Sequence, residues 1–342
     1  MKDDGSYTYP PLHLPARDIP VPASVSHEAQ TAMAQVMAAP RVEVPQLAPD
    51  DVEGWRAAVV RLDALLQRML GVTDETPTLG EVRLPYGTGR VEQLDADGAV
   101  VYDVLPEGAQ RKDRRVFLDL HGGGWTLCGG RLCRIFALRA ALRIRARVWS
   151  VDYRMPPDHP HPAPLDDCLT AYRHLLDHRR PQEIVLGGSS AGGNLAAALV
   201  LRARDDGLPL PAAVVLDSAA LDLTASGDTW QTNLGLDDML SHSVQSAMLL
   251  YAAEHDLRDP RLSPLFGDFG KGFPPTLLAS GTRDVLLSDS VRMHRALRAA
   301  GIPAELHLLE AAGHGKFAGI GPEYRELSRE IRAFADAHWS AG

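Results

Sequence analysis

A cluster of glycines and serines, Gly187-Gly-Ser-Ser-Ala-Gly-Gly193, forces a sharp corner into this chain. The residues Glu183–Leu186 before it, three of which are apolar, predict a short buried strand, and the residues after it are rich in helix formers. Gly188 and Gly192 stand two positions on either side of Ser190, which is the G-x-S-x-G spacing of a strained strand-to-helix turn. Ser190 is therefore a candidate nucleophile. An ordinary strand–turn–helix corner is the alternative, because glycine and serine are common in turns.

A second glycine-rich stretch lies upstream of this corner. The segment Arg115–Leu120 predicts another buried strand, and it leads directly into His121-Gly-Gly-Gly-Trp125. Three consecutive glycines leave backbone amides free to face a ligand, as in an oxyanion hole, although a flexible loop would have the same composition. The two stretches in this order favour acyl transfer.

Composition and charge exclude several other classes. The 342 residues carry a net charge of -9, which argues against nucleic acid or an anionic membrane as the main partner. The first ten residues contain charge and proline where a signal peptide needs an apolar run, so we expect a cytoplasmic protein. The cysteines, Cys128, Cys133 and Cys168, are odd in number and widely spread. Such spacing indicates neither a disulfide framework nor a zinc site, and we expect no metal or cofactor.

Strands and helices alternate from about residue 81 onward. The predicted strands are Glu81–Leu84, Val100–Leu105, Arg115–Leu120, Val148–Val151, Glu183–Leu186, Ala213–Leu216, Thr276–Ser280 and Ala304–Leu309. The predicted helices between and after them are Leu132–Arg145, Pro164–His178, Asn194–Arg204, Ser288–Ala300 and Pro322–His338. This alternation predicts an α/β fold with a mostly parallel, eight-stranded sheet and helices on both faces. The site then lies at the carboxyl ends of the strands.

Two further segments are expected to form a helical cap. Residues 1–75 contain predicted helices at His27–Ala39 and Asp51–Leu70, and the second has an apolar stripe to bury. The stretch from about 219 to 272 interrupts the alternation and predicts a helix near Ser241–Glu254. We therefore predict an N-terminal cap segment over residues 1–75 and a catalytic domain over 76–342 that carries a second cap insertion.

A serine nucleophile needs a base, and the base needs an orienting carboxylate. His314 lies in a glycine-flanked loop directly after the predicted last strand, and Asp284 follows the penultimate strand. His307 lies within the last strand and is expected to be structural. Asp289 starts a predicted helix, where capping is the simpler explanation.

The motifs resemble those of the hormone-sensitive-lipase-like branch of the α/β-hydrolases, which are bacterial esterases. The resemblance rests on His121-Gly-Gly-Gly-Trp125, Gly188-Ser-Ser-Ala-Gly192, Asp152-Tyr-Arg-Met-Pro-Pro-Asp-His-Pro-His-Pro162 with Leu165-Asp-Asp167, and Asp259-Pro-Arg-Leu-Ser-Pro264. It covers roughly residues 75–340. It implies the α/β-hydrolase fold with a helical cap, and a triad of Ser190, Asp284 and His314. It also implies an oxyanion hole formed by the N–H groups of Gly122, Gly123 and Ala191.

The chain departs from this family at three positions. Ser189 replaces the aspartate before the nucleophile and is a rival nucleophile in a looser frame; we also place it in the substrate pocket. His161 stands where the family has phenylalanine, and Gly315-Lys-Phe317 departs from the usual H-G-F. Trp125 follows the oxyanion glycines and is predicted to form a wall of the acyl pocket, with core packing beneath the loop as the alternative.

The resemblance implies a carboxylesterase that acts on small-molecule esters. We expect short- to medium-chain acyl groups, no nucleic-acid or membrane partner, and a homodimer as one open assembly state. A lactonase or an amidase would use the same triad. A small-molecule receptor on the same fold is a rival of another class, although such a receptor does not need a complete triad.

Overall fold

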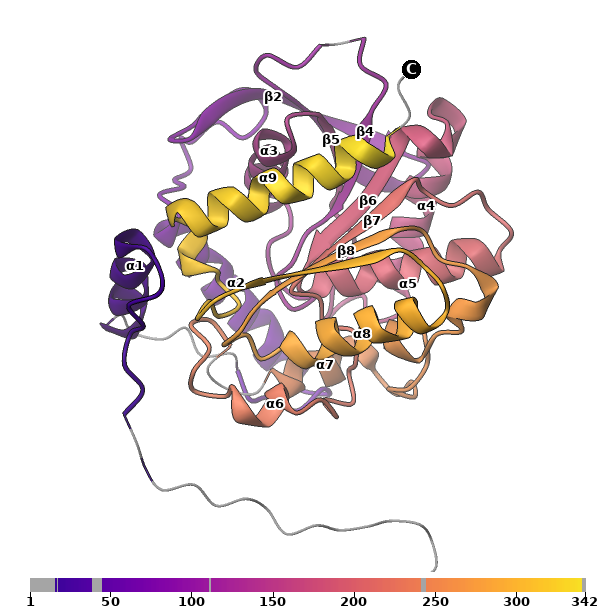
Figure 1. Cartoon of the computed structure of the whole chain (residues 1–342). Helices are drawn as coiled ribbons and strands as arrows, with labels where there is room; N and C mark the ends of the chain where they lie inside the picture. The colour runs from indigo at the N-terminus through magenta and orange to yellow at the C-terminus, as the bar shows by residue number, and fades with distance from the viewer. Residues whose placement is uncertain (1–15, 17, 39–44, 111, 241–243, 340–342) are drawn as a thin grey trace, which may run out of the picture.

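The computed structural model describes residues 16, 18–38, 45–110, 112–240 and 244–339. A central sheet lies between two layers of helices (Figure 1). Helices α3 (Arg131–Ile144) and α9 (Gly321–His338) cross one face, while α5 (Ala191–Asp205) and α8 (Leu287–Ala299) lie along the other (Figure 1). This is the predicted α/β architecture, and it brings the ends of many strands to one edge.

The sheet has nine strands within the described residues, in the order β1-β2-β3-β5-β4-β6-β7-β8-β9. Their bounds are β1 Gly80–Leu84, β2 Gly87–Ala96, β3 Ala99–Pro106, β4 Val116–Leu120, β5 Arg147–Val151, β6 Ile184–Ser189, β7 Ala213–Asp217, β8 Thr276–Gly281 and β9 Ala304–Leu309. Strands β1, β2, β3 and β5 pair antiparallel in that order, and the remaining pairs are parallel. The mostly parallel sheet is therefore confirmed.

The prediction of eight strands is wrong by one, because it omitted β2. This strand alternates exposed and buried residues, and it contains Gly89 and several charged side chains that lower its apparent strand character. An ideal Cβ on Gly89 would lie 2.6 Å from Cδ1 of Leu138 and 3.0 Å from the carbonyl oxygen of Leu105. Glycine is needed there because α3 packs closely on the strand.

The core consists of two large clusters, one on each face of the sheet. Along β4, Val116 and Leu118 belong to the cluster that contains residues of α4 (Ala163–His178), α5 and α8. The intervening Phe117 belongs to the cluster that contains residues of α1 (His27–Ala38), α3 and α9. The central strands are apolar on both faces because helices cover both.

The other predicted helices are also present. They include α2 (Val52–Met69), which the Asp51 side chain caps by accepting from the backbone N–H of Gly54, and α7 (Gln245–Ala252). Residues 241–243 of the predicted Ser241–Glu254 helix, and Ala39, lie outside the described residues. Helix α5 begins at Ala191, three residues before the predicted start, directly after the serine corner. The short α6 (Thr229–Thr232) was not predicted.

The two N-terminal helices pack in different places. Helix α1 contacts α9 and the single turn η4 (Phe317–Gly319), and the Ser26 backbone N–H donates to the Glu323 carboxylate at 2.6 Å. In α2, Trp55 packs with Ala247 and Leu250 of α7. The N-terminal segment therefore packs against the rest of the chain in two places, on α9 and η4 through α1 and on α7 through α2. The division at residue 75 stays a prediction.

Among the described helices, none combines the length and the apolar character needed to cross a lipid bilayer.

Candidate active site

Ser190 forms the corner between β6 and α5. Its backbone has φ 58° and ψ -121°, a sparsely populated conformation for a residue with a side chain. An ideal Cβ on Gly192 would lie 1.8 Å from the carbonyl oxygen of Leu120, and one on Gly188 would lie 2.4 Å from the carbonyl carbon of Gly192. Neither position has room for a Cβ, which is the glycine requirement expected of such a corner.

The two adjacent serines occupy different structural positions. Ser189 is the last residue of β6, aligned with Asp217 of β7, and its side chain is exposed. Of the two, only Ser190 has a positive φ. Its backbone N–H donates to the carbonyl of Asp217 at 3.0 Å, and its own carbonyl accepts from Asn194 at 3.1 Å. Strand and helix thus fix Ser190 from both sides.

The oxyanion candidates lie beside this corner. An ideal Cβ on Gly122 would lie 3.4 Å from Cβ of Ser190, so the glycine loop passes close to the serine. Gly123 has φ 108°, and an ideal Cβ on it would lie 2.4 Å from the carbonyl of Leu127. Ala191 is the first residue of α5, where backbone N–H groups lack helical acceptors. Gly122 is therefore next to Ser190 in space and Ala191 in sequence, and Gly123 directly follows Gly122.

The motif that begins at Asp152 supports this loop. The ring of Tyr153 stacks on that of His121 with centroids 4.1 Å apart, and its hydroxyl donates to the carbonyl of His121 at 2.7 Å. Asp152 accepts from the Gly130 backbone N–H at 2.9 Å and from the Tyr102 hydroxyl at 2.8 Å. The segment has no reacting group of its own. It holds His121 at the start of the glycine loop, and Gly130 five residues beyond its end.

Asp284 and His314 meet at the carboxyl edge of the sheet. Oδ1 of Asp284 lies 3.3 Å from Nδ1 of His314, and the Asp284 side chain is fully buried. The second carboxylate oxygen accepts from the hydroxyls of Ser218 at 2.5 Å and Ser280 at 2.9 Å. These contacts orient the carboxylate toward the imidazole, leaving Nε2 of His314 as the ring nitrogen available for a base.

The same contacts determine the charges of the pair. Burial alone would raise the pKa of Asp284, but the charge and hydrogen bond of His314 and the charge of Lys316 hold that pKa well below its usual range. Burial alone would lower the pKa of His314, whereas Asp284 and then Asp237 raise it above its ordinary value. Asp284 therefore remains ionised and stabilises a protonated His314.

Two carboxylates that the sequence analysis missed hold the His314 loop. Asp237 accepts from the backbone N–H of His314 at 3.2 Å and from that of Val285 at 2.8 Å. Asp238 accepts from the backbone N–H of Gly315 at 2.8 Å. Both lie between β7 and β8, where no motif indicates a contact with a loop about 77 residues later. The segment predicted to form the second cap insertion is thus bound to the loop that carries the candidate base.

The rejected candidates have structural partners. His307 contacts Glu330 through Nδ1 at 2.7 Å, consistent with a structural role. The expectation that Asp289 caps α8 is wrong. Its buried carboxylate accepts from the backbone N–H of Leu221 at 2.8 Å and from Nε1 of Trp230 at 2.9 Å, and so ties the segment after β7 to α8.

Trp125, which follows the three glycines, is buried. Only 2% of it is exposed, and its ring stacks on Tyr251 with centroids 4.7 Å apart. This packing matches the core alternative more closely than a wall that faces the substrate. Ser189, the other pocket candidate, is exposed at the end of β6.

The fold also gathers a possible metal-binding group that the sequence spacing did not indicate. Ligand atoms of His121, Cys133 and Asp152 lie within 4.8 Å of one another. Burial raises the pKa of the Cys133 thiol well above its usual range, and Sγ lies 3.6 Å from Oγ of Ser150. Asp152 already accepts hydrogen bonds from the protein. A protonated thiol and an engaged carboxylate make a poor ligand set, because metals bind thiolate.

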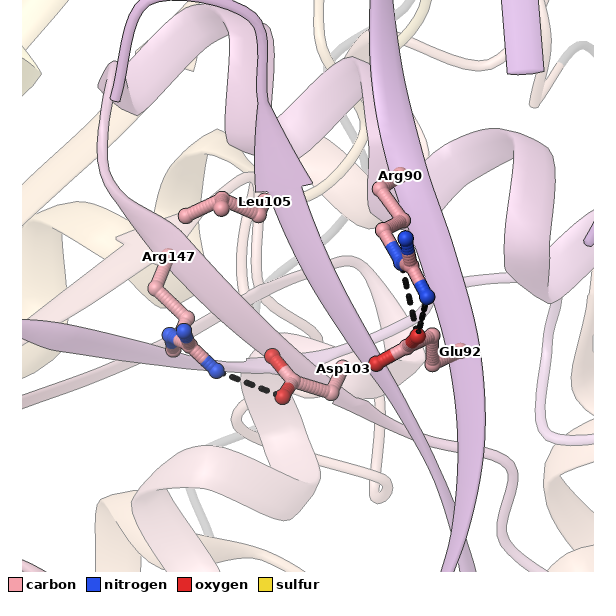
Figure 2. Close-up of a pocket in the computed structure, with 5 residues that line it drawn as sticks. All are labelled: Arg90, Glu92, Asp103, Leu105 and Arg147. Carbon is pink, nitrogen blue, oxygen red and sulfur yellow. Dashed lines mark hydrogen bonds and ion pairs between the residues drawn. The ribbon is translucent and has the colours of Figure 1, made fainter. Parts of the chain in front are cut away.

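A small hollow elsewhere on the sheet is lined by charged residues of β2, β3 and β5 (Figure 2). Asp103 pairs with Arg147 at 2.6 Å, and Arg90 donates to Glu92 (Figure 2). None of the triad candidates lines this hollow.

Comparison with known proteins places the chain in a family. Residues 117–318 match the model described as the alpha/beta hydrolase fold. The chain is 32% identical to an esterase of Acinetobacter venetianus over 66% of its own length and 76% of the relative's. It is 36% identical to an acetyl-hydrolase of Streptomyces hygroscopicus, over 56% of its own length and 65% of the relative's.

A solved structure supports the same placement. An esterase from the bacterial hormone-sensitive lipase family superposes with a TM-score of 0.75 and 31% identity, over 93% of this chain and 100% of that one. The chain therefore belongs to the α/β-hydrolase fold family, and within it to the hormone-sensitive-lipase-like carboxylesterases.

Proposed function

We propose that the protein hydrolyses carboxylic esters through an acyl-enzyme on Ser190. The Ser190 hydroxyl attacks the ester carbonyl while His314 accepts its proton, and the N–H groups of Gly122, Gly123 and Ala191 receive the developing oxyanion. His314 then protonates the departing alcohol. Water, activated by the same base, releases the acid and restores the serine.

The observation that carries this proposal is the buried pair of Asp284 and His314 at the edge where Ser190 forms its strained corner. Strands β6, β7, β8 and β9 are parallel neighbours, so the residues after β6, β8 and β9 project from one edge. A carboxylate, an imidazole and a serine on neighbouring strand ends are the parts that acyl transfer needs.

We propose short- to medium-chain acyl esters of small molecules as substrates. The acetyl-hydrolase relative is named for a two-carbon acyl group. We also propose that the enzyme works in the cytoplasm, uses no cofactor, and acts on neither nucleic acid nor membranes. Its assembly as a homodimer is an expectation that analytical ultracentrifugation can test.

The rival functions differ in observable ways. A lactonase or an amidase would share every step up to departure of the leaving group, so kcat/KM on matched ester, lactone and amide substrates separates them. A receptor would bind without turnover. Burst release of p-nitrophenol from p-nitrophenyl acetate, equal to the enzyme concentration, distinguishes an enzyme from a receptor.

The decisive experiment labels the nucleophile. A fluorophosphonate should add to the protein in equal amount with loss of activity. Tandem mass spectra with fragment ions between Ser189 and Ser190 should place the adduct on Ser190. An adduct on Ser189 would overturn the assignment, and an active protein that takes no label would overturn the serine mechanism.

A further inference from the structure

Lys316 is a buried lysine two residues beyond the candidate base. Only 4% of it is exposed, although a lysine is rarely buried without a partner. Its Nζ lies 2.9 Å from Oδ1 of Asp217, at the end of β7, and donates to Oγ of Ser218 at 2.5 Å. The ammonium therefore points into the protein, toward the strand ends that carry the triad.

The Ser218 hydroxyl connects this lysine to the triad. Having accepted from Lys316, it donates its own proton to Oδ2 of Asp284 at 2.5 Å. The opposite oxygen, Oδ1, faces Nδ1 of His314 at 3.3 Å. A continuous line of donors and acceptors therefore runs from the ammonium through Ser218 and Asp284 to the imidazole.

Asp217, the ion-pair partner of Lys316, is itself held by residues of α3 and α9. Oδ2 of Asp217 accepts from Arg143 of α3 at 2.9 Å, and the Arg143 guanidinium lies 5.2 Å from the ring centre of Tyr324 of α9. Burial alone would raise the pKa of Asp217, but Lys316 and Arg143 lower it to about 2. Asp217 is thus an anion that balances two cations, the buried Lys316 and the partly buried Arg143.

The backbone also indicates that this lysine is held in place. Lys316, Phe317 and Ala318 have φ values of 45°, 58° and 55°, a left-handed conformation that residues with side chains rarely adopt in succession. Phe317 is buried beside them. Such a backbone persists only where the surroundings determine it. The loop that presents His314 therefore also directs Lys316 inward.

We propose that Lys316 is a positioning residue of the triad, acting through the Ser218 hydroxyl and through its charge on Asp284 and His314. This inference rests on the proposed esterase function. Lys316 holds the Ser218 hydroxyl, and Ser218 and Ser280 hold Oδ2 of Asp284, so Oδ1 stays directed at the imidazole. Neither residue contacts the reacting atoms in this arrangement.

The charge of Lys316 also opposes protonation of the base. The ionisable groups around His314 are Asp284 after β8, Asp237 and Asp238 from the cap insertion, and Lys316 from its own loop, with Asp217 and Arg143 behind the lysine. The carboxylates raise the pKa of His314, and Lys316 lowers it. Burial alone would lower the pKa of Lys316, but Asp217 and Asp284 raise it above its usual range, so the lysine remains charged.

The test compares pH profiles of kcat/KM on p-nitrophenyl acetate for the full chain. The variants are Lys316→Met, which removes the charge at similar volume, Lys316→Arg, which keeps it, and Ser218→Ala, which removes the bridging hydroxyl. Lys271→Met is the matched control, because Lys271 is exposed and lies 3.9 Å from Asp268 at the surface. The downfield ¹H NMR resonance of the His314 Nδ1 proton gives its titration without turnover.

With Lys316→Met, we expect the acidic limb of the profile and the NMR titration to move to higher pH, and the plateau to fall on the order of tenfold, as for other outer partners of a reactive group. Lys316→Arg should restore the limb, and Lys271→Met should match the parent. Ser218→Ala should lower the plateau. If Lys316→Met lowered kcat/KM equally at every pH and left the acidic limb of the profile unchanged, the effect of the charge would be overturned.

A Ser218→Ala plateau equal to that of the parent would overturn the positioning through the hydroxyl, and this variant keeps the proposal testable if Lys316→Met does not fold. The NMR titration separates this inference from the proposed function. A parent protein without esterase activity would contradict the proposed function. A His314 Nδ1 titration that is the same in the parent and in Lys316→Met would contradict the inference about Lys316.

Discussion

The carbonyl oxygen of Leu120 lies 1.8 Å from the point that a Cβ on Gly192 would occupy. This close approach joins the end of the strand before the glycine loop to the helix that begins at Ala191. It therefore sets the distance between the candidate oxyanion donors and the candidate nucleophile. No side-chain rearrangement can relieve the overlap, because the contacting atom belongs to the backbone.

Gly192→Ala should consequently lower the free energy of unfolding by at least about 3 kcal/mol and abolish activity in whatever folds, because the backbone must move apart at the corner. Gly270→Ala is the matched control. Its Cβ would meet only an exposed oxygen of Asp268 at 3.1 Å, and the change in stability should be within about 0.5 kcal/mol. Urea unfolding followed by circular dichroism measures both. Equal stability of the two variants would contradict this account of the corner.

Ser190→Ala should reduce kcat on the order of 10⁶-fold without changing the fold, by analogy with other serine triads. Ser189→Ala should keep most of the activity, because Ser189 ends the strand and lacks the positive φ of the corner. Steady-state kinetics on p-nitrophenyl acetate compares the two. An inactive Ser189→Ala enzyme would place the nucleophile one residue earlier.

Asp284→Asn should reduce kcat on the order of 10⁴-fold, because the amide no longer favours the imidazole tautomer that the reaction needs. Asp289→Asn is a useful comparison, since it alters a second buried carboxylate on the adjacent helix. Its effect should appear in the melting temperature, because Asp289 holds Leu221 and Trp230. Loss of activity in folded Asp289→Asn with an active Asp284→Asn would exchange the two roles.

The activity should fall on acidification at a pH above that expected for an ordinary histidine. Only neutral imidazole accepts the serine proton, and Asp284 and Asp237 raise the pKa of His314, so protonation removes the base while the pH is still comparatively high. Burial raises the pKa of Asp238 to about 6, so this carboxyl also titrates in the pH range of the acidic limb. Asp238→Asn therefore serves as the control, and a limb that persists in it belongs to His314.

Short acyl esters should be preferred, with kcat/KM highest at acyl chains of roughly two to eight carbons. Trp125→Ala should lower the free energy of unfolding by about 3–5 kcal/mol, because the ring fills the core against Tyr251. The assay is a series of p-nitrophenyl esters from acetate to palmitate, with thermal melts. A stable variant that shifts toward longer esters would restore Trp125 as a pocket wall.

The sequence predicted the parts of this molecule whose signals are local. The glycines around Ser190 report a close approach that only glycine allows, and the apolar runs of the central strands report burial on two faces. By contrast, β2 is half exposed and rich in charge, so its pattern is weak even though its residues Gly89–Ala96 pair with β3. Its strand character comes from the partner.

The missed features of the candidate site depend on distant contacts. Asp237 and Asp238 resemble any exposed carboxylates in the sequence, and only the folded chain brings them to the backbone of the loop around His314. Lys316 is visible as a departure from the family pattern. Its partners, Asp217 and Ser218, lie about 98 residues away, and no spacing rule connects them. The burial of Trp125 against Tyr251 likewise depends on a contact between residues that are distant in the sequence.

The carboxylates of Asp237 and Asp238 also limit how this enzyme can be engineered. An insertion transplanted from a relative would replace Asp237 and Asp238, and the amides of His314, Gly315 and Val285 would then lose their acceptors. A change intended to alter only the substrate range would in that way also weaken the hydrogen bonds that hold the loop of His314. Chimeras that retain this pair of aspartates should keep turnover, so module boundaries in this enzyme are better drawn by hydrogen bonds than by sequence position.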